Sequence, residues 1–196
     1  VAKKQLGLEL GNAEDFRSFE ELLTAFWKQM KYFIDIKVEG SNTIESIYAR
    51  YMPVPFLSII TNDCIKKGKD YNAGGARYNT SYLQGVGIGT ITDCLSAIKL
   101  HVYDRKDLPM SRLMEALHAN FEGCGDVRHL LLDESPKYGN DDDYADEIMK
   151  TVFHHYHDFV TGRPNMRGGQ YRGNMLPTTC HVYFGEVMEA SPDGRL

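Results

Sequence analysis

The pattern of apolar and polar positions predicts a mostly helical chain. Between residues 18 and 38 the apolar side chains recur every three or four positions, which places them on one face of a helix. Ser18 and Glu21 form a capping box at the start of this helix. Residues 43–51 predict a short second helix, which ends before the prolines that follow.

The helical spacing recurs later in the chain. It predicts helices over residues 91–103 and 141–160, and a third that begins at Pro109 and Ser111 and stops near Gly123. The helix at 141–160 carries acidic side chains near its start and histidines near its end, which suits the helix dipole. Helices therefore dominate the predicted structure.

Strands are few in the prediction. The glycine-rich stretches 68–90 and 162–174 predict long ordered loops, the first with one short strand. Residues 179–184 predict a second short strand because they are rich in β-branched and aromatic side chains. A sheet of one or two strands is not stable alone, so we expect partner strands outside this chain. The chain starts at Val1 and stops in a turn-like stretch, which favours an internal segment over a complete domain.

The composition argues against several classes of function. The chain has 196 residues, 42% of them hydrophobic, and a net charge of −5, which does not favour a nucleic-acid or anionic-membrane partner. It contains no apolar run long enough to cross a membrane and no leader-like start. The 4 cysteines include no CxxC pair, so we expect reduced thiols, a cytoplasmic location and no zinc site.

Three clusters of residues could bind a ligand, but a structural role explains each of them more simply. Residues 85–90 (GVGIGT) could cradle a phosphate, but they match neither GxGxxG nor a Walker loop, so close packing is favoured. Asp141, Asp142 and Asp143 lack the spacing of a calcium loop and suit a helix start. Of the histidines at 154, 155 and 157, only the first and last share a helix face, so no metal is expected.

Two further groups of residues leave alternatives open. The arginines near the C-terminus could bind a carboxylate or phosphate, or be solvated loop charges; they are Arg163, Arg167, Arg172 and Arg195. The segment Thr178-Thr179-Cys180-His181 could orient a polar substrate through its hydroxyls. Adjacent side chains of a strand point to opposite faces, so Cys180 and His181 are not expected to meet.

Three stretches of the chain resemble motifs of the glycyl radical enzymes, the superfamily of pyruvate formate-lyase-like proteins. Residues 74–79 (GGARYN) with 93–99 (DCLSAIK) resemble its "GGxxYN … DSLxAIK" segment. Residues 136–146 (PKYGNDDDYAD) are similar to its "PKYGNDDxxAD", and 190–195 (ASPDGR) resemble its "TPDGR" turn. The resemblance spans about residues 68–196, and the helix at 18–38 fits the upstream region.

Within the superfamily, residues 78–82 and 175–185 are most similar to the dehydratases of trans-4-hydroxy-L-proline. A formate acetyltransferase that cleaves pyruvate with coenzyme A is the nearest alternative. A third alternative, from a different class, is a non-catalytic helical binding module, which would fold stably by itself.

The resemblance implies an α/β fold, in which residues 1–196 are a helix-rich internal part of a ten-stranded barrel. The barrel consists of two five-stranded parallel halves packed antiparallel. The resemblance also implies a radical mechanism, in which a glycyl radical generates a thiyl radical on a Cys-x-Glu loop. A separate activating enzyme that uses S-adenosylmethionine and an iron–sulfur cluster installs the radical. A homodimer and a small-molecule substrate are implied as partners, and no tightly bound cofactor.

The chain departs from the family pattern at the residues that carry the radical. It contains no Cys-x-Glu and no RVxGY motif, so we expect no catalytic residue in this chain and no turnover by it alone. The family's substrate-contacting threonine, which follows a proline, corresponds to Thr178, with Thr179 as the alternative. The resemblance therefore implies substrate binding by this threonine pair.

Overall fold

The computed structural model describes residues 6–176 and 179–196. These residues form two compact units, each with its own internal contacts. Unit 1 comprises Val1–Lys28, Gly85–His155 and Met175–Leu196, and unit 2 comprises Gln29–Gln84 and Tyr156–Asn174.

The described elements follow one another in this order: the 3-10 helix η1 (Ala13–Asp15), α1 (Phe19–Tyr51), α2 (Pro55–Ile60), α3 (Cys64–Lys67), β1 (Ser81–Gln84), α4 (Ile88–Ala97), the π-helix η2 (Ile98–Asp104), α5 (Met110–His118), α6 (Gly125–Asp133), α7 (Asp143–Val160), β2 (Tyr171–Asn174) and α8 (Cys180–Val187). The chain is therefore a helix-rich α/β structure.

Helix α1 begins as the sequence predicts but runs further. The backbone N–H of Glu21 donates to Ser18 Oγ over 3.2 Å, which confirms the cap at its start. The separate helix expected at 43–51 is wrong, because α1 continues without a break to Tyr51. Gly40 weakens a helix by only about 1 kcal/mol, which neighbouring turns overcome, and Pro53 is the first residue that cannot continue it.

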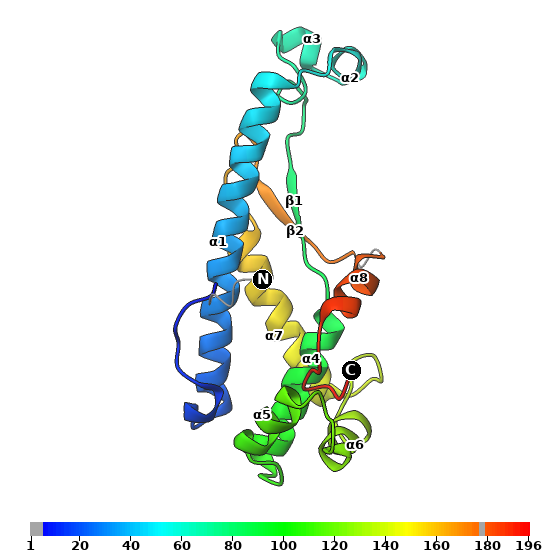
Figure 1. Cartoon of the computed structure of the whole chain (residues 1–196). Helices are drawn as coiled ribbons and strands as arrows, with labels where there is room; N and C mark the ends of the chain where they lie inside the picture. The colour runs from blue at the N-terminus through cyan, green and yellow to red at the C-terminus, as the bar shows by residue number, and fades with distance from the viewer. Residues whose placement is uncertain (1–5, 177–178) are drawn as a thin grey trace. The chain divides into compact units, whose positions relative to one another are not determined.

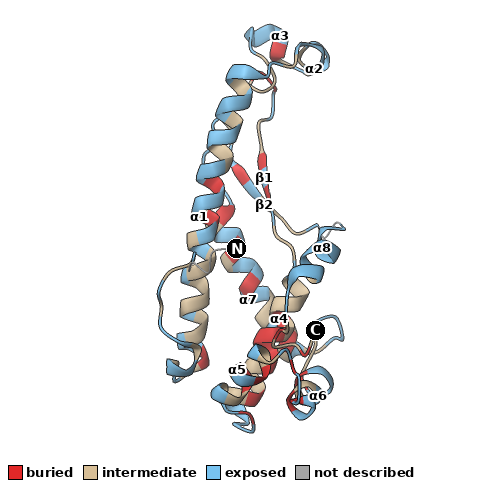
Figure 2. Ribbon diagram, in the orientation of Figure 1, coloured by how far each residue is buried: buried red, intermediate tan, exposed pale blue. Residues whose placement is uncertain are grey.

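The core of unit 1 lies where α4, α5 and α6 meet. Its buried members are Ala97, Leu108, Leu113, Ala116, Phe121, Cys124, Val127 and Leu131. Figure 2 shows this concentration of buried residues on α4 and the neighbouring helices. The helices expected over 91–103 and after Pro109 are confirmed, although the first begins at Ile88 and the second ends at His118. Helix α6 was not predicted.

Unit 2 contains a parallel pair of strands. Ser81 pairs with Tyr171 and Leu83 with Gly173, so β1 and β2 run side by side in the same direction (Figure 1). Ser81, Leu83 and Tyr171 are buried, whereas Tyr82 lies on the exposed face. The short strand expected in the first glycine-rich loop is confirmed as β1, and β2 lies in a stretch predicted to be only loop.

The strand predicted over residues 179–184 is wrong. Residues 180–187 form helix α8, and Thr179 precedes it in a helical backbone conformation. β-Propensity depends on a partner strand and a half-buried surface. In the structure Tyr183 of this segment is 66% exposed, so it packs on no sheet face that would favour a strand.

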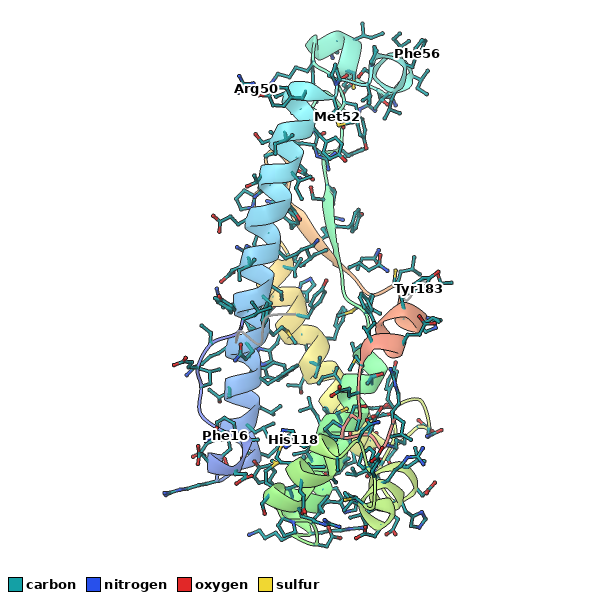
Figure 3. All side chains as sticks on the ribbon, in the orientation of Figure 1. Phe16, Arg50, Met52, Phe56, His118 and Tyr183 are labelled. Atoms are coloured by element: carbon teal, nitrogen blue, oxygen red, sulfur yellow. The ribbon has the colours of Figure 1, made fainter. Side chains whose placement is uncertain are left out.

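Helix α2 exposes apolar side chains. None of its 6 residues is buried, and Phe56 and Ile60 are 86% and 81% exposed. Figure 3 shows the Phe56 ring on the outer side of the helix. Among the described residues, no helix has the length and apolar character needed to span a bilayer.

Candidate functional site

The predicted substrate-binding pair falls at the edge of what the structure describes. Thr178 lies outside the described residues. Thr179 is exposed at the start of α8, and its side chain makes no capping hydrogen bond there. Both follow β2 closely in sequence, since that strand ends at Asn174. In parallel sheets, ligands are bound by the segments that leave the carboxyl ends of the strands.

A network of polar side chains in unit 2 fixes the amino ends of both strands. Ser81 donates its hydroxyl hydrogen to Glu45 Oε1 over 2.6 Å, and its oxygen accepts from Asn165 Nδ2 and an Arg167 guanidinium nitrogen at 2.9 and 3.2 Å. Arg167 lies 3.5 Å from Glu45 Oε1, so the charges are paired. This network joins α1, β1 and the loop before β2.

The loop before β2 approaches β1 so closely that only glycine fits. A Cβ at Gly169 would overlap the carbonyl oxygen of Asn79, and one at Gly74 would overlap that of Arg167. Asn165 closes the loop, because its Oδ1 accepts from the backbone N–H groups of Arg167 and Gly169. Gly74 and Gly169, one from each glycine-rich stretch, thus allow close backbone packing.

Two of the four arginines considered for anion binding, Arg163 and Arg167, have acidic partners within unit 2. Arg163 contacts Asp35 at 2.6 Å, and Arg167 contacts Glu45 and donates to the carbonyl oxygen of Thr80. Arg172 is exposed on β2. Arg163 and Arg167 therefore form ion pairs within the protein. Neither the anion-binding alternative nor the solvated-charge alternative predicted this role.

At the carboxyl ends of the strands, Tyr156 of α7 contacts both of them. Its hydroxyl donates to the carbonyl oxygen of Leu83 over 2.5 Å, and its ring packs against Gly173. Burial raises the pKa of Tyr156 to about 12, and a hydrogen bond from the backbone of Asn174 partly opposes that rise. The phenol is therefore a neutral donor at physiological pH.

In unit 1, three of the stretches that carry the family resemblance are joined by hydrogen bonds, namely residues 93–99, 136–146 and 190–195. Lys137 Nζ donates to the carbonyl oxygens of Leu131 and Asp193, each over 2.8 Å. Asp93 Oδ1 accepts from the backbone N–H of Tyr138 at 2.7 Å. Arg128 Nε donates to the carbonyl oxygen of Gly194. The turn at 191–195 is thus held by the side chains of Lys137 and Arg128.

In the described structure, none of the cysteines has the surroundings of a reactive thiol in a Cys-x-Glu loop. Cys64, Cys94 and Cys124 are buried, and Cys180 is exposed without the Glu of a Cys-x-Glu loop. Burial raises the pKa of Cys94 to about 12, and the nearby charge of Asp193 adds to this. Cys94 therefore stays a thiol and packs as a small apolar side chain.

The remaining clusters have structural roles. Asp142 begins α7, since its carboxylate and carbonyl oxygens accept from the N–H groups of Tyr144 and Ala145. His155 stacks on Trp27 with ring centroids 4.2 Å apart. Residues 85–90 lead from β1 into α4, with Gly87 at φ +91°. Within the described ranges, no three His, Cys, Asp or Glu side chains converge as metal ligands.

Sequence reasoning missed Tyr156, Lys137 and the polar network around Ser81. Tyr156 occupies the apolar stripe of a helix, where a tyrosine is indistinguishable from core. Lys137 lies in a quoted motif, so its position could have been singled out, but its partners are 56 and 6 residues away. Only the fold brings these groups together.

The relatives found by comparison with known proteins agree with one another. The family model "Pyruvate formate lyase-like" matches residues 1–185. The chain is 60% identical over its whole length to a trans-4-hydroxy-L-proline dehydratase of Clostridioides difficile and 34% identical over 98% of its length to a (2S)-3-sulfopropanediol dehydratase of Klebsiella oxytoca. It spans about a quarter of the length of these curated relatives.

Solved structures agree with the sequence matches. The crystal structure of the Clostridioides difficile hydroxyproline dehydratase with trans-4-hydroxy-L-proline bound superposes with a TM-score of 0.96 over 99% of this chain and 25% of that one. The glycerol-bound, B12-independent glycerol dehydratase from Clostridium butyricum gives a TM-score of 0.94 at 37% identity, over 100% of this chain and 25% of that one.

The stretches that meet in unit 1 are among those on which the family resemblance rests, and the family model matches residues 1–185. The chain therefore belongs to the pyruvate formate lyase-like family.

Proposed function

We propose that this chain is part of a glycyl radical enzyme that removes water from trans-4-hydroxy-L-proline. The observation that carries the proposal is the identity of 60% over all 196 residues to a dehydratase of that substrate. Identity to the sulfopropanediol dehydratase is 34%. The gap between the two values favours the hydroxyproline subfamily over other dehydratases.

The role proposed for this chain is substrate binding rather than radical chemistry. Its sequence has no Cys-x-Glu, and its buried Cys94 has a pKa raised to about 12. Thr178 and Thr179 follow the carboxyl end of β2, which is where parallel sheets bind ligands. A hydroxyl at this position can hydrogen-bond the carboxylate or amine of the substrate.

The exposed apolar side chains support a longer parent chain. Within unit 2, Phe56, Ile60 and Ile65 are 86%, 81% and 72% exposed. Exposed apolar patches commonly mark surfaces that another part of a protein covers. We propose that these residues belong to a ten-stranded barrel of two five-stranded halves, completed by the rest of the parent, so that residues 1–196 are one internal segment of it.

The parent would need partners that this chain does not contain. We propose a radical on a glycine of the parent, installed by an activating enzyme with S-adenosylmethionine and an iron–sulfur cluster, and a homodimeric assembly. None of the four cysteines forms a disulfide in the described structure, which suits a cytoplasmic location because disulfides are rare there.

The proposed function is tested by identifying the products that the parent enzyme forms. The full-length parent is activated anaerobically and incubated with trans-4-hydroxy-L-proline, and separately with pyruvate and coenzyme A. We expect a product lighter by one water from hydroxyproline and no formate from pyruvate. Formate production without loss of water would support the formate acetyltransferase alternative and overturn the proposal.

A further inference from the structure

Tyr82 and Arg172 are neighbours on the open face of the two-stranded sheet in unit 2. They are in-register partners on the parallel strands β1 and β2. Ser81 and Tyr171, which precede them, are buried and hydrogen-bond side chains of α1. Successive side chains of a strand point to opposite faces. Tyr82 and Arg172 therefore lie together on the face away from α1, where both are exposed.

Arg172 differs from the two arginines that precede it because its charge is not paired. Arg163 contacts Asp35, and Arg167 contacts Glu45. In the part of the chain that the structure describes, Arg172 makes no ion pair and no hydrogen bond. Its guanidinium group, which carries several N–H donors and no acceptor, is therefore available to an anion.

Tyr82 places a phenol beside this guanidinium group. Its side chain is 61% exposed, and its hydroxyl has no hydrogen-bond partner among the described residues. Neighbouring strands lie about 4.8 Å apart, so the long side chains of Tyr82 and Arg172 can reach one small ligand together. A few polar groups that converge on one point are typical of a small-molecule site.

The open face of this sheet needs a cover in the parent. Parallel sheets in proteins are covered on both faces almost without exception, and here α1 packs on one face only. The chain spans about a quarter of its hydroxyproline dehydratase relative, so the parent has ample chain to enclose the other face. An enclosed guanidinium group without an anion is costly. The planar group of Arg172 matches a carboxylate, which it can bind through two parallel hydrogen bonds.

We propose that Arg172 and Tyr82 bind the carboxylate of the substrate. The guanidinium group donates to both carboxylate oxygens, and the phenol donates to one of them. This inference rests on the proposed function and deepens it, because it assigns the group that distinguishes an amino-acid substrate from a neutral polyol. Glycerol, which is bound by the structural relative at 37% identity, has no carboxylate.

The test measures binding to the full-length parent without its radical, so that no turnover occurs. Isothermal titration calorimetry gives the Kd of trans-4-hydroxy-L-proline and of 3-hydroxypyrrolidine, which has the same ring without the carboxylate. We expect Arg172→Gln to raise the Kd of hydroxyproline about tenfold or more and that of 3-hydroxypyrrolidine less than about twofold. A merely structural role would weaken both equally, and that result overturns the inference.

The matched control is Arg50→Gln. Arg50 is also an exposed arginine of unit 2, and its guanidinium carbon lies 5.2 Å from the centre of the Tyr51 ring. Its replacement removes the same charge and should change the Kd of hydroxyproline less than about twofold. An equal rise in Kd for the two glutamine variants would overturn the inference, because any lost positive charge would then have the same effect.

Two further variants keep the test decisive if Arg172→Gln does not fold. Arg172→Lys keeps the charge but loses the planar fork, and Tyr82→Phe loses only the hydroxyl. Each should raise the Kd of hydroxyproline about threefold or more. An unchanged Kd in folded Arg172 variants overturns the inference, even where their thermal stability falls, because Arg172 would then pair with a carboxylate of the parent.

The proposed function is checked separately in the activated wild type. If the wild type dehydrates hydroxyproline while the Arg172 variants bind it normally, only the inference fails. Absence of water loss by the activated wild type overturns the proposed function, and the inference falls with it.

Discussion

Lys137 donates to the backbone carbonyl oxygen of Asp193 over 2.8 Å and thereby joins two of the motif stretches that identify the family. The same ammonium group donates to the carbonyl oxygen of Leu131 at the end of α6. An ammonium with two carbonyl acceptors is well suited to hold a turn that has no strand or helix of its own.

We predict that Lys137→Met loosens the turn at 191–195. A hydrogen bond to a charged group is worth about 1.5–3 kcal/mol, so amide exchange at Ser191 and Gly194 should become at least about tenfold faster. Hydrogen exchange with mass spectrometry of the parent measures this. Lys150→Met is the control, because its ion pair with Glu147 is exposed and contributes little. Equal exchange in both variants would contradict the role of Lys137.

The network around Ser81 leads to a second prediction. Ser81→Ala removes one hydroxyl that serves Glu45, Asn165 and Arg167. Glu45 Oε1 then keeps only its longer contact of 3.5 Å with Arg167. We expect a loss of about 2 kcal/mol in the free energy of unfolding. Urea unfolding of the parent, monitored with a probe in unit 2, measures this loss.

Ser46→Ala is the matched control for Ser81→Ala. Ser46 is exposed on α1. Its replacement should change stability by less than about 0.5 kcal/mol. If both variants lose the same amount, the buried network does not stabilise the amino ends of the strands as we describe.

Asp70 gives the third prediction, which concerns pH. Its carboxylate accepts from the backbone N–H of Val54, the hydroxyl of Ser58 and the backbone N–H of Asn72 at 2.7–2.9 Å. Burial raises the pKa of Asp70, but these hydrogen bonds together outweigh it and the net shift is downward. Folding therefore favours the ionised form.

The sign of the pH dependence follows from that downward shift. The stabilisation is fully present above the ordinary aspartate pKa of about 3.9 and is lost as the pH falls through the lower folded-state value. The difference in thermal midpoint between wild type and Asp70→Asn should hold from pH 7 to about 4 and shrink below that. A difference that stays constant down to pH 3 would contradict the assignment.

Sequence patterns predicted the helices well where capping and spacing agree. Ser18 and Glu21 mark the start of α1, and Asp142 marks the start of α7, because such side chains satisfy N–H groups that a helix leaves free. The continuity of α1 between the stretches 18–38 and 43–51 could not be predicted in the same way. Asn42 looks like a helix breaker, yet its side chain bonds Met166 and Tyr171, far away in the sequence.

The strands and the candidate site depended on tertiary contacts. Residues 179–184 have the composition of a strand but form α8, because strand formation needs a partner that this segment lacks in the described structure. Residues 171–174 contain a glycine and an arginine, and they form β2 because β1 lies beside them. Tyr156 acquires its role only from this pairing.

The fourth prediction concerns the threonine pair itself. In the parent, Thr178→Val should reduce kcat/KM for hydroxyproline about tenfold or more, since an unpaired buried polar group costs about 1–3 kcal/mol. Thr179→Val, at the exposed start of α8, should leave kinetics near wild type. Steady-state kinetics decide between them. The reverse order would assign the contact to Thr179, and two unchanged variants would remove the pair from the site.

The central claim is the identity of the substrate, and the ratio of two specificity constants tests it most directly. Activated full-length parent is assayed for loss of water from trans-4-hydroxy-L-proline and from glycerol, the molecule bound by the structural relative at 37% identity. We predict a kcat/KM for hydroxyproline at least about a hundredfold higher, as expected where a site hydrogen-bonds groups that the competitor lacks. An equal or higher value for glycerol would contradict the account.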